Sequence, residues 1–110
     1  MDELIHSLEE FVAQRDWQQF HTPKNLAMAL SVEVAEIIEH FQWLTPTESQ
    51  ELTPAACDEV ADEIGDVQIY LILLSRKLGV DPIQAALRKL EKNQKRFPAE
   101  AFRGKHSNER

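Results

Sequence analysis

Residues 33–43 read EVAEIIEHFQW, and this stretch decides how the rest of the chain is organised. On a helical wheel, at about 100° per residue, one apolar stripe runs through and beyond it, formed by Leu26, Leu30, Val34, Ile37, Ile38, Phe41 and Leu44. Glu33 falls on the edge of the stripe, and Glu36 and Trp43 follow beside it. A carboxylate half inside a core must be protonated, hydrogen-bonded or bound to a cation. The stretch therefore predicts a helix whose acidic side chains need a partner.

A second acidic segment offers that partner. Residues 60–74 read VADEIGDVQIYLILL, and Glu63 and Asp66 repeat the one-turn spacing of Glu33 and Glu36. With 26 residues between Glu36 and Glu63, two antiparallel helices could bring the four carboxylates face to face. Neither motif contains Lys or Arg, so a divalent cation such as Mg²⁺ is the simplest neutralising group. The alternative is four ordinary solvated acids, because acidic pairs at this spacing are common on helices.

Length and composition limit the size of the core and the number of domains. The chain has 110 residues, a net charge of −7 and 43% hydrophobic residues, which suits one domain with a modest core. We expect this domain to span residues 1–98 and a flexible polar tail to span 99–110. Long amphipathic helices in so small a chain favour oligomerisation to complete the core. No apolar run is long enough for a membrane span, and the acidic start is unlike a signal peptide, so we expect a cytoplasmic protein.

The charge is unevenly distributed. Residues 1–75 hold 2 basic and 15 acidic side chains, whereas residues 76–110 hold 10 basic and 4 acidic ones. Nucleic acid is a poor match, because it requires a broad basic face. A small polyphosphate fits better, because metal ions could hold it against the acidic half while the basic segment meets its outer oxygens. Packing of oppositely charged helices against each other would also explain the distribution.

Helical periodicity and Thr-Pro or Asp-Pro starts predict an all-α fold with four main helices and a short one. The expected segments are 2–15, 23–43, 46–52, 54–78 and a last helix from Pro82 to Phe97. Gly79 should end the fourth of these. In the last helix, Ile83, Ala86, Leu87 and Leu90 should face inward. No segment alternates with the period of a strand.

Several polar and aromatic residues are candidates for binding. Trp17, Phe20 and His21 lie on a connector, where they either plug the end of the bundle or form a stacking platform. Tyr70, on the face of Glu63 and Asp66, either points into their cavity or belongs to the core. Lys89, Asn93 and Arg96 share one face and suit a row of phosphate oxygens, although a solvated basic face is the simpler explanation. Glu59 could add an outer hydrogen bond, and His40, one turn after Glu36, could orient it.

Two other classes of protein explain part of the pattern. A ferritin-like di-iron bundle requires Glu-x-x-His motifs. Ile37 stands where a motif ending at His40 would need glutamate, and Asp66 stands where a motif beginning at Glu63 would need histidine. A non-enzymatic helical dimerisation module explains the amphipathic pattern but has no use for carboxylates at the core edge. Loss of those carboxylates would stabilise such a module and remove no activity.

The chain resembles the MazG-like nucleoside triphosphate pyrophosphohydrolases, whose signature is ExxE, a spacer and ExxD. The resemblance runs from about residue 11 to residue 98, through RDWQQFHTPKNL, EVAEIIEHFQW, DEIGDVQIYL and KLEKNQKRFP, and is greatest to the dCTP pyrophosphatase branch. It implies an all-α bundle completed by dimerisation, as a homodimer or homotetramer, and Mg²⁺-dependent hydrolysis of a deoxynucleoside triphosphate to monophosphate and pyrophosphate. The base could be that of dCTP, a modified dCTP, dUTP or dATP.

The resemblance also assigns roles to residues. Glu33, Glu36, Glu63 and Asp66 would hold the metal, and Glu33 or Glu36 would activate the attacking water. The substrate would be bound by Trp17, His21, Asn25, Trp43, Tyr70, Lys89, Asn93 and Arg96. Leu8 stands where some relatives have a histidine, which leaves the base preference open.

Overall fold

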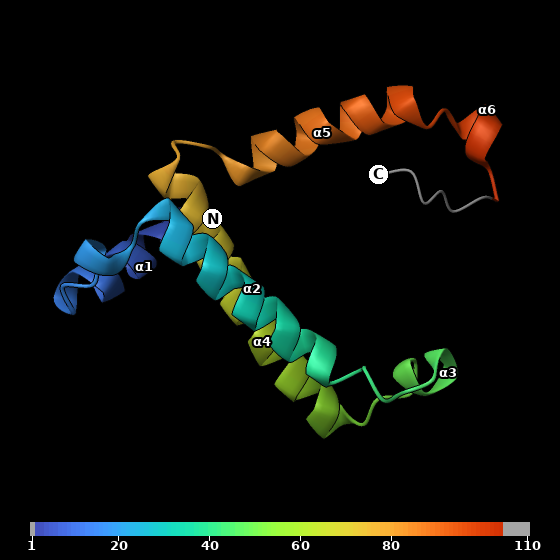
Figure 1. Cartoon of the computed structure of the whole chain (residues 1–110), viewed down its shortest axis with the longest axis horizontal. Helices are drawn as coiled ribbons and strands as arrows, with labels where there is room; N and C mark the ends of the chain where they lie inside the picture. The colour runs from blue at the N-terminus through green and yellow to red at the C-terminus, as the bar shows by residue number, and fades with distance from the viewer. Residues whose placement is uncertain (1, 105–110) are drawn as a thin grey trace. The chain divides into compact units, whose positions relative to one another are not determined.

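The computed structural model describes residues 2–104, which form helices and connecting turns with no strand among them. The elements in chain order are α1 (Asp2–Gln14), the 3₁₀ helix η1 (Gln18–Phe20), α2 (Pro23–Glu39), α3 (Pro46–Ser49), α4 (Pro54–Lys77), α5 (Pro82–Arg96) and α6 (Ala99–Phe102) (Figure 1). The prediction of an all-α fold with four long helices and one short helix is confirmed. The two short elements η1 and α6 were not expected.

Four helices begin with the same local device. Thr22, Thr45 and Thr53 precede α2, α3 and α4, and each accepts a backbone N–H with its side chain while a proline follows at the first helical position. Asp81 precedes α5, and its Oδ1 accepts the N–H groups of Ile83 and Gln84 at 2.9 and 3.2 Å. These side chains satisfy N–H groups that have no partner within the helix. The Thr-Pro and Asp-Pro pairs thus fix the starts of the helices.

Two helices end earlier than predicted. The helix expected to reach Trp43 ends at Glu39, and the one expected to reach Leu52 ends at Ser49. The same local constraint follows both ends, because a residue before proline is restricted to extended backbone. Thr45 and Thr53 have ψ values of 162° and 157°, so the chain must leave the helix before them. The predicted end of α4 is confirmed, since Gly79 follows it with φ of +67°.

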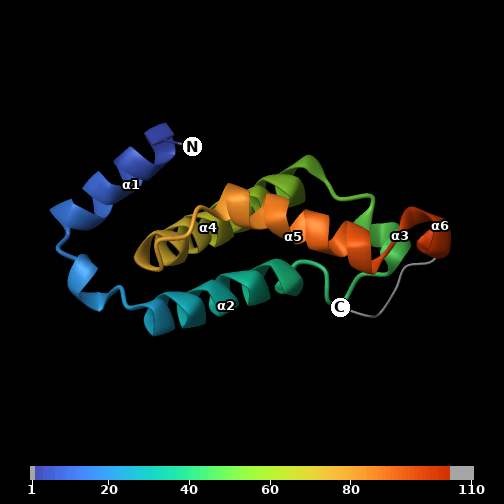
Figure 2. The ribbon, with the colours of Figure 1, turned by 90° about the horizontal axis from the view of Figure 1, so that it is seen from above.

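The chain divides into two compact units, Met1–Gly79 and Val80–Arg110. In the first unit, α2 and α4 lie side by side and antiparallel (Figures 1 and 2). Leu26 on α2 and Ile72 on α4 are each only 1% exposed and form the centre of a small core. This antiparallel pair carries both acidic motifs.

Helix α1 joins the core through its apolar face. Leu8 and Val12 are buried, and the α1 residue Glu9 meets Arg76 near the end of α4, with Oε2 and Nη2 3.0 Å apart. The ion pair is about half exposed, so it contributes little by itself. The burial of Leu8 and Val12 is therefore the main attachment of α1.

Much apolar surface stays uncovered in the single chain. On α5, Ile83, Leu87 and Leu90 are each just over half exposed and Ala86 is also exposed. The second unit by itself therefore does not bury the four residues that were predicted to face inward. On α2, Met28, Val32 and Ile38 are similarly exposed, because this helix is apolar on most of its sides. A helix of this kind is usually buried on more than one face.

The end of the second unit is short and partly helical. Within the expected tail, Ala99–Phe102 forms α6, and the rings of Phe97 and Phe102 meet edge to face at 5.1 Å between centroids. The rest of that tail, residues 105–110, lies outside the described residues. Among the described helices, none has the length and apolar content needed to cross a membrane.

Candidate metal centre

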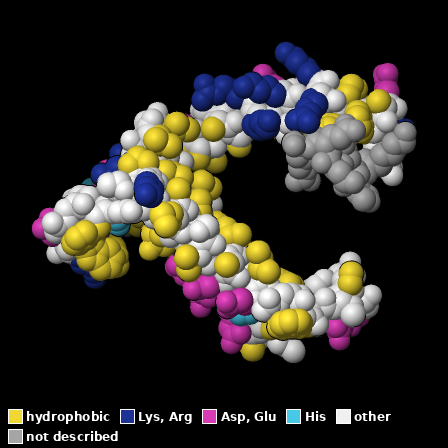
Figure 3. All heavy atoms as spheres, in the orientation of Figure 1, with side chains coloured by type: hydrophobic (Ala, Val, Ile, Leu, Met, Phe, Trp, Pro, Cys, Tyr) yellow, Lys and Arg dark blue, Asp and Glu magenta, His cyan; other side chains and the backbone are white. Residues whose placement is uncertain are grey.

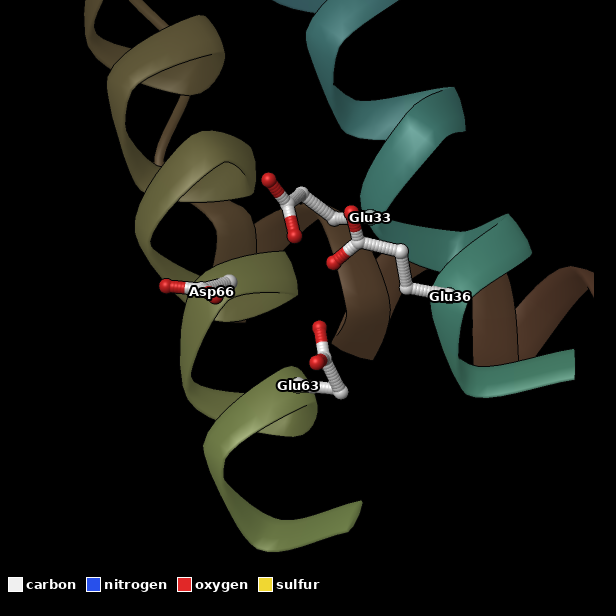
Figure 4. A group of neighbouring side chains, drawn as sticks. All are labelled: Glu33, Glu36, Glu63 and Asp66. Atoms are coloured by element: carbon white, nitrogen blue, oxygen red, sulfur yellow. The ribbon is translucent and has the colours of Figure 1, made fainter. Parts of the chain in front are cut away.

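The four acids of the two motifs converge between α2 and α4. We call Glu33, Glu36, Glu63 and Asp66 the acid cluster. One carboxylate oxygen from each residue lies within 4.8 Å of one from every other residue, and Figure 4 shows the two α2 side chains reaching toward the two on α4. The convergence predicted from the repeated one-turn spacing is confirmed.

Among residues 2–104, no cationic side chain forms an ion pair with the acid cluster. The ion pairs of the described residues involve Glu9, Glu10 and Glu59 but no member of the cluster. Oε2 of Glu33 and Oε2 of Glu63 are buried and have no hydrogen-bond partner among the described residues. Buried polar atoms without a partner cost free energy and call for an explanation. An ion held by these oxygens would supply one.

Mutual repulsion shifts the proton affinity of two cluster members. Burial raises the pKa of Glu33, and the adjacent Glu36 carboxyl and the charge of Asp66 raise it further. The Glu36 carboxyl, close enough to share a proton, raises the pKa of Glu63 to about 7, with further contributions from burial and from the other two acids. Without an ion, the cluster is therefore partly protonated at neutral pH.

The arrangement fits a hard divalent cation. All four donors are carboxylate oxygens, which Mg²⁺ and related ions prefer. Oxygens around an ion at roughly 2.1 Å can lie at most about 4.2 Å apart, so the observed spread of 4.8 Å needs only a small contraction. Asp66 is exposed whereas the three glutamates are half-buried, which leaves an open side for a ligand of the ion.

A further contact lies beside the acid cluster on the same two helices. Nδ1 of His40, at the end of α2, lies 4.0 Å from Oε2 of Glu59, one turn before Glu63 on α4. The sequence suggested that His40 could orient Glu36 and that Glu59 could form an outer contact. The structure instead pairs these two candidates with each other.

Two of the predicted substrate residues lie at the other end of the α2–α4 pair. His21 precedes α2 and lines a hollow of about 260 Å³ bordered by α1, η1 and the end of α4, together with Ile5, Leu8, Glu9, Val12, Gln18, Leu73, Arg76 and Lys77. Burial lowers the pKa of His21, and the charge of Lys77 lowers it further. Lys77 follows Asp66 by 11 residues of α4, which is roughly 16 Å along a helix. His21 is thus not beside the acid cluster of its own chain.

Trp17 and Asn25 have structural contacts at the same end. The ring of Trp17 meets that of Phe11 edge to face at 5.6 Å, and the Arg15 guanidinium lies 3.7 Å from the centroid of the Phe11 ring. Nδ2 of Asn25 donates to the carbonyl of Phe20 at 3.1 Å, which pins η1 to the start of α2. Trp17 remains 42% exposed, so its ring is both supported and accessible.

The other aromatic candidates lie nearer the acid cluster. Trp43 lies in the turn after α2 and is 86% exposed. Tyr70 follows Asp66 by one turn of α4 and is half-buried. Both therefore remain available on the half of the helix pair that bears the acids.

The basic row forms the face that was predicted. Lys89, Asn93 and Arg96 border one hollow on α5 together with Phe97, whose ring centroid lies 5.1 Å from the Arg96 guanidinium. Figure 3 shows the basic side chains gathered along α5 and the acidic ones along the α2–α4 pair. This row belongs to the second unit, Val80–Arg110.

The sequence interpretation missed three basic residues near Trp17 and His21. Arg15 stacks on Phe11 four residues earlier, a spacing that could have signalled the contact. Arg76 and Lys77 line the hollow near His21. They lie on α4, far from His21 in the sequence, so no local sequence pattern could predict this contact.

An all-α chain with two facing pairs of carboxylates is what the resemblance to MazG-like proteins implied, and comparison with known families supports that resemblance. Residues 28–109 match the MazG-like family. The chain therefore belongs to the MazG-like family.

Individual relatives are similar over most of the chain. It is 43% identical to mouse dCTP pyrophosphatase 1 over 97 residues and 44% identical to the human protein over 96 residues, each match covering 86% of this chain. The chain spans a little over half the length of these relatives, 57% and 56%. A crystal structure of a pyrophosphatase from Archaeoglobus fulgidus has 45% sequence identity and a TM-score of 0.85, covering 89% of this chain and 92% of that one.

Proposed function

We propose that this protein is a Mg²⁺-dependent nucleotide pyrophosphatase that hydrolyses dCTP or a base-modified dCTP to the monophosphate and pyrophosphate. The observation that carries the proposal is the convergence of four carboxylates. Within the described part of the chain they pair with no cation, and Oε2 of Glu33 and Oε2 of Glu63 are buried without a hydrogen-bond partner. The similarity to dCTP pyrophosphatase 1 over 86% of the chain supports the choice of reaction and base.

The acid cluster would hold the ion through Glu33, Glu36, Glu63 and Asp66. A bound Mg²⁺ would offset the charge of the phosphate oxygens and increase the acidity of water. One of Glu33 and Glu36 accepts the proton of the water whose oxygen attacks the α-phosphorus. The bond from the α-phosphorus to the bridging oxygen then breaks, and pyrophosphate leaves with that oxygen.

Other side chains would orient the substrate. The exposed ring of Trp43 offers a surface on which a base can stack, and Tyr70 lies one turn beyond Asp66. Lys89, Asn93 and Arg96 would meet the outer phosphate oxygens, while Trp17, His21 and Asn25 would border the nucleoside. Because His21 lies roughly 16 Å along the helix pair from its own acid cluster, the two sets of residues would meet across subunits.

We further propose a homodimer or a homotetramer as the active form. The exposed apolar residues of α2 and α5, among them Met28, Val32 and Leu87, support this. Their coverage by a second copy would contribute roughly 25 cal/mol per Å² of apolar surface. A second copy would also bring basic and aromatic residues from one chain to the acids of another.

The test is a panel of deoxynucleotides with Mg²⁺ in water enriched in ¹⁸O. We expect dCTP or 5-modified dCTP to give monophosphate carrying the label and unlabelled pyrophosphate, because water attacks the α-phosphorus. Release of orthophosphate would reject the proposed bond cleavage, and a preference for dUTP or dATP would replace the proposed base.

Two variants examine the acid cluster itself. Glu36→Gln and Asp66→Asn should lose turnover while circular dichroism shows unchanged helicity. Glu39→Gln is the matched control, since Glu39 is an exposed acid on α2. Near-normal turnover of both cluster variants would dismiss the metal assignment. If Glu33→Ala and Glu63→Ala raised the melting temperature and the unchanged chain hydrolysed no nucleotide, the dimerisation module would be the better interpretation.

A further inference from the structure

The contact between His40 and Glu59 continues the pattern of the acid cluster by one turn. On α2, Glu33 and Glu36 are followed by His40, at spacings of three and four residues. On α4, Glu59 precedes Glu63 and Asp66 at spacings of four and three. Such residues share a helix face, so His40 and Glu59 extend the row of facing acids. Their 4.0 Å separation agrees with this placement.

The spacing of residues on α2 predicts a different partner for His40 from the one observed. Glu36 lies four residues before it, and a carboxylate followed four residues later by a cationic or N–H donor is a favoured pair on a helix. His6 and Glu10 form an i, i+4 contact of this kind on α1, with Nε2 and Oε1 3.4 Å apart. No ion pair joins His40 to Glu36 among the described residues. The contact that His40 makes is with Glu59 on α4 instead.

This choice of partner matters for Glu36. Each acid of the cluster offers one oxygen to an ion, and an imidazole N–H bound to the Glu36 carboxylate would compete with the ion for its lone pairs. A protonated imidazole there would in addition repel the ion. The side chain of His40 is 26% exposed whereas that of Glu59 is 70% exposed, so Glu59 approaches a comparatively fixed imidazole from the solvent side.

We propose that Glu59 is a positioning residue for the metal centre, which draws the His40 imidazole toward α4 and so leaves the Glu36 carboxylate to the ion. The inference rests on the proposed function, because it presumes that the acid cluster binds Mg²⁺. Glu59 acts through His40 and touches neither ion nor substrate. Its removal should release His40 to Glu36 and weaken binding of the ion.

The first measurement is Mg²⁺ binding by calorimetry without nucleotide. Glu59→Ala should weaken binding about 10-fold, in the range found for residues behind metal ligands. Glu59→Gln should stay within about twofold of the unchanged protein, because its amide oxygen can accept a hydrogen bond from the imidazole once the two side chains close their 4.0 Å separation. Asp58→Ala is the matched control: it removes an equal charge from the adjacent, also exposed position and should also stay within about twofold.

The second measurement removes the histidine. His40→Ala in the Glu59→Ala background should restore binding, because no imidazole remains to occupy Glu36, and His40→Ala alone should bind as the unchanged protein does. In the metal-free protein, nitrogen-detected NMR should show a change of the His40 imidazole signals in Glu59→Ala but not in Asp58→Ala. Circular dichroism checks that each variant keeps its helicity, and Glu59→Met gives a second variant without an acceptor.

The outcomes separate this inference from the proposed function. Equal binding by the Glu59→Ala and Asp58→Ala variants, or failure of His40→Ala to restore it, would overturn the positioning role while leaving the metal centre in place. If the unchanged protein takes up no Mg²⁺ with or without nucleotide, the proposed function itself fails.

Discussion

Binding of Mg²⁺ to the acid cluster should expel protons at neutral pH. The pKa of Glu63 is raised to about 7 in the protein without an ion, so this carboxyl is about half protonated at pH 7, about nine-tenths at pH 6 and about one-tenth at pH 8. An ion requires the deprotonated form. Uptake of Mg²⁺ should therefore release about 0.5 proton at pH 7, about 0.9 at pH 6 and about 0.1 at pH 8 from Glu63.

The assay is calorimetric titration with Mg²⁺ at each pH in two buffers of different ionisation enthalpy. The difference between the two observed heats gives the number of protons released. Glu63→Gln should reduce that number, and Asp62→Asn, which changes an exposed neighbour, should not. Heats that are the same in both buffers at pH 6 and pH 7 would refute the reasoning, because they would mean that no carboxyl loses a proton to the ion.

The same shift fixes the sign of a stability effect. A carboxyl whose pKa is higher in the folded than in the unfolded state stabilises the fold only while it is protonated. The free energy of unfolding of the metal-free protein should thus fall as the pH rises from about 4.5 to about 7. Saturating Mg²⁺ should oppose that fall, since it binds the deprotonated folded state. A metal-free protein that gains stability over this interval would contradict the assignment.

The remaining predictions concern stability. Ile72→Ala should lower the free energy of unfolding by about 3 kcal/mol in urea titration, because Ile72 is 1% exposed; a loss near zero would place it outside the core. Gly79→Ala should cost about 1 kcal/mol because φ is +67° there, whereas Gly65→Ala, inside α4 with open space at the added Cβ, should gain up to about 1 kcal/mol. Equal effects of the two changes would argue against the conformational explanation. The lowered pKa of His21 predicts that stability declines as the pH falls below about 6.5, because the unfolded chain takes up a proton first; His21→Gln should reduce that decline in a pH series of thermal melts.

Local chemistry made much of the fold predictable. Thr22, Thr45, Thr53 and Asp81 each precede a proline, and these pairs fixed four helix starts because capping depends on neighbouring residues alone. Gly79 fixed one end in the same way. The ends near Glu39 and Ser49 were misplaced because the apolar pattern continues past them. The backbone there already forms turns with i to i+3 hydrogen bonds, from Phe41 N–H to the Ile38 carbonyl and from Glu51 N–H to the Glu48 carbonyl.

The acid cluster was predictable for a different reason. Each one-turn spacing places two carboxylates on one helix face, and both pairs border an apolar stripe that two antiparallel helices bring together. The contact between His40 and Glu59 depends on the relative rotation of α2 and α4, which no local spacing specifies. Periodicity shows that the helix of Ile83, Leu87 and Leu90 has an apolar face but not what covers it, and the second unit by itself leaves these residues exposed.

The antiparallel pair of α2 and α4 has one last consequence. All four acids come from a single helical hairpin, and its connector contains α3 and the exposed residues Gln50 and Glu51. A loop that doubles in length costs only about 0.6 kcal/mol in closure entropy. Peptides inserted between Gln50 and Glu51 should therefore be tolerated, which makes this connector a practical place for a tag or reporter that leaves the metal centre undisturbed.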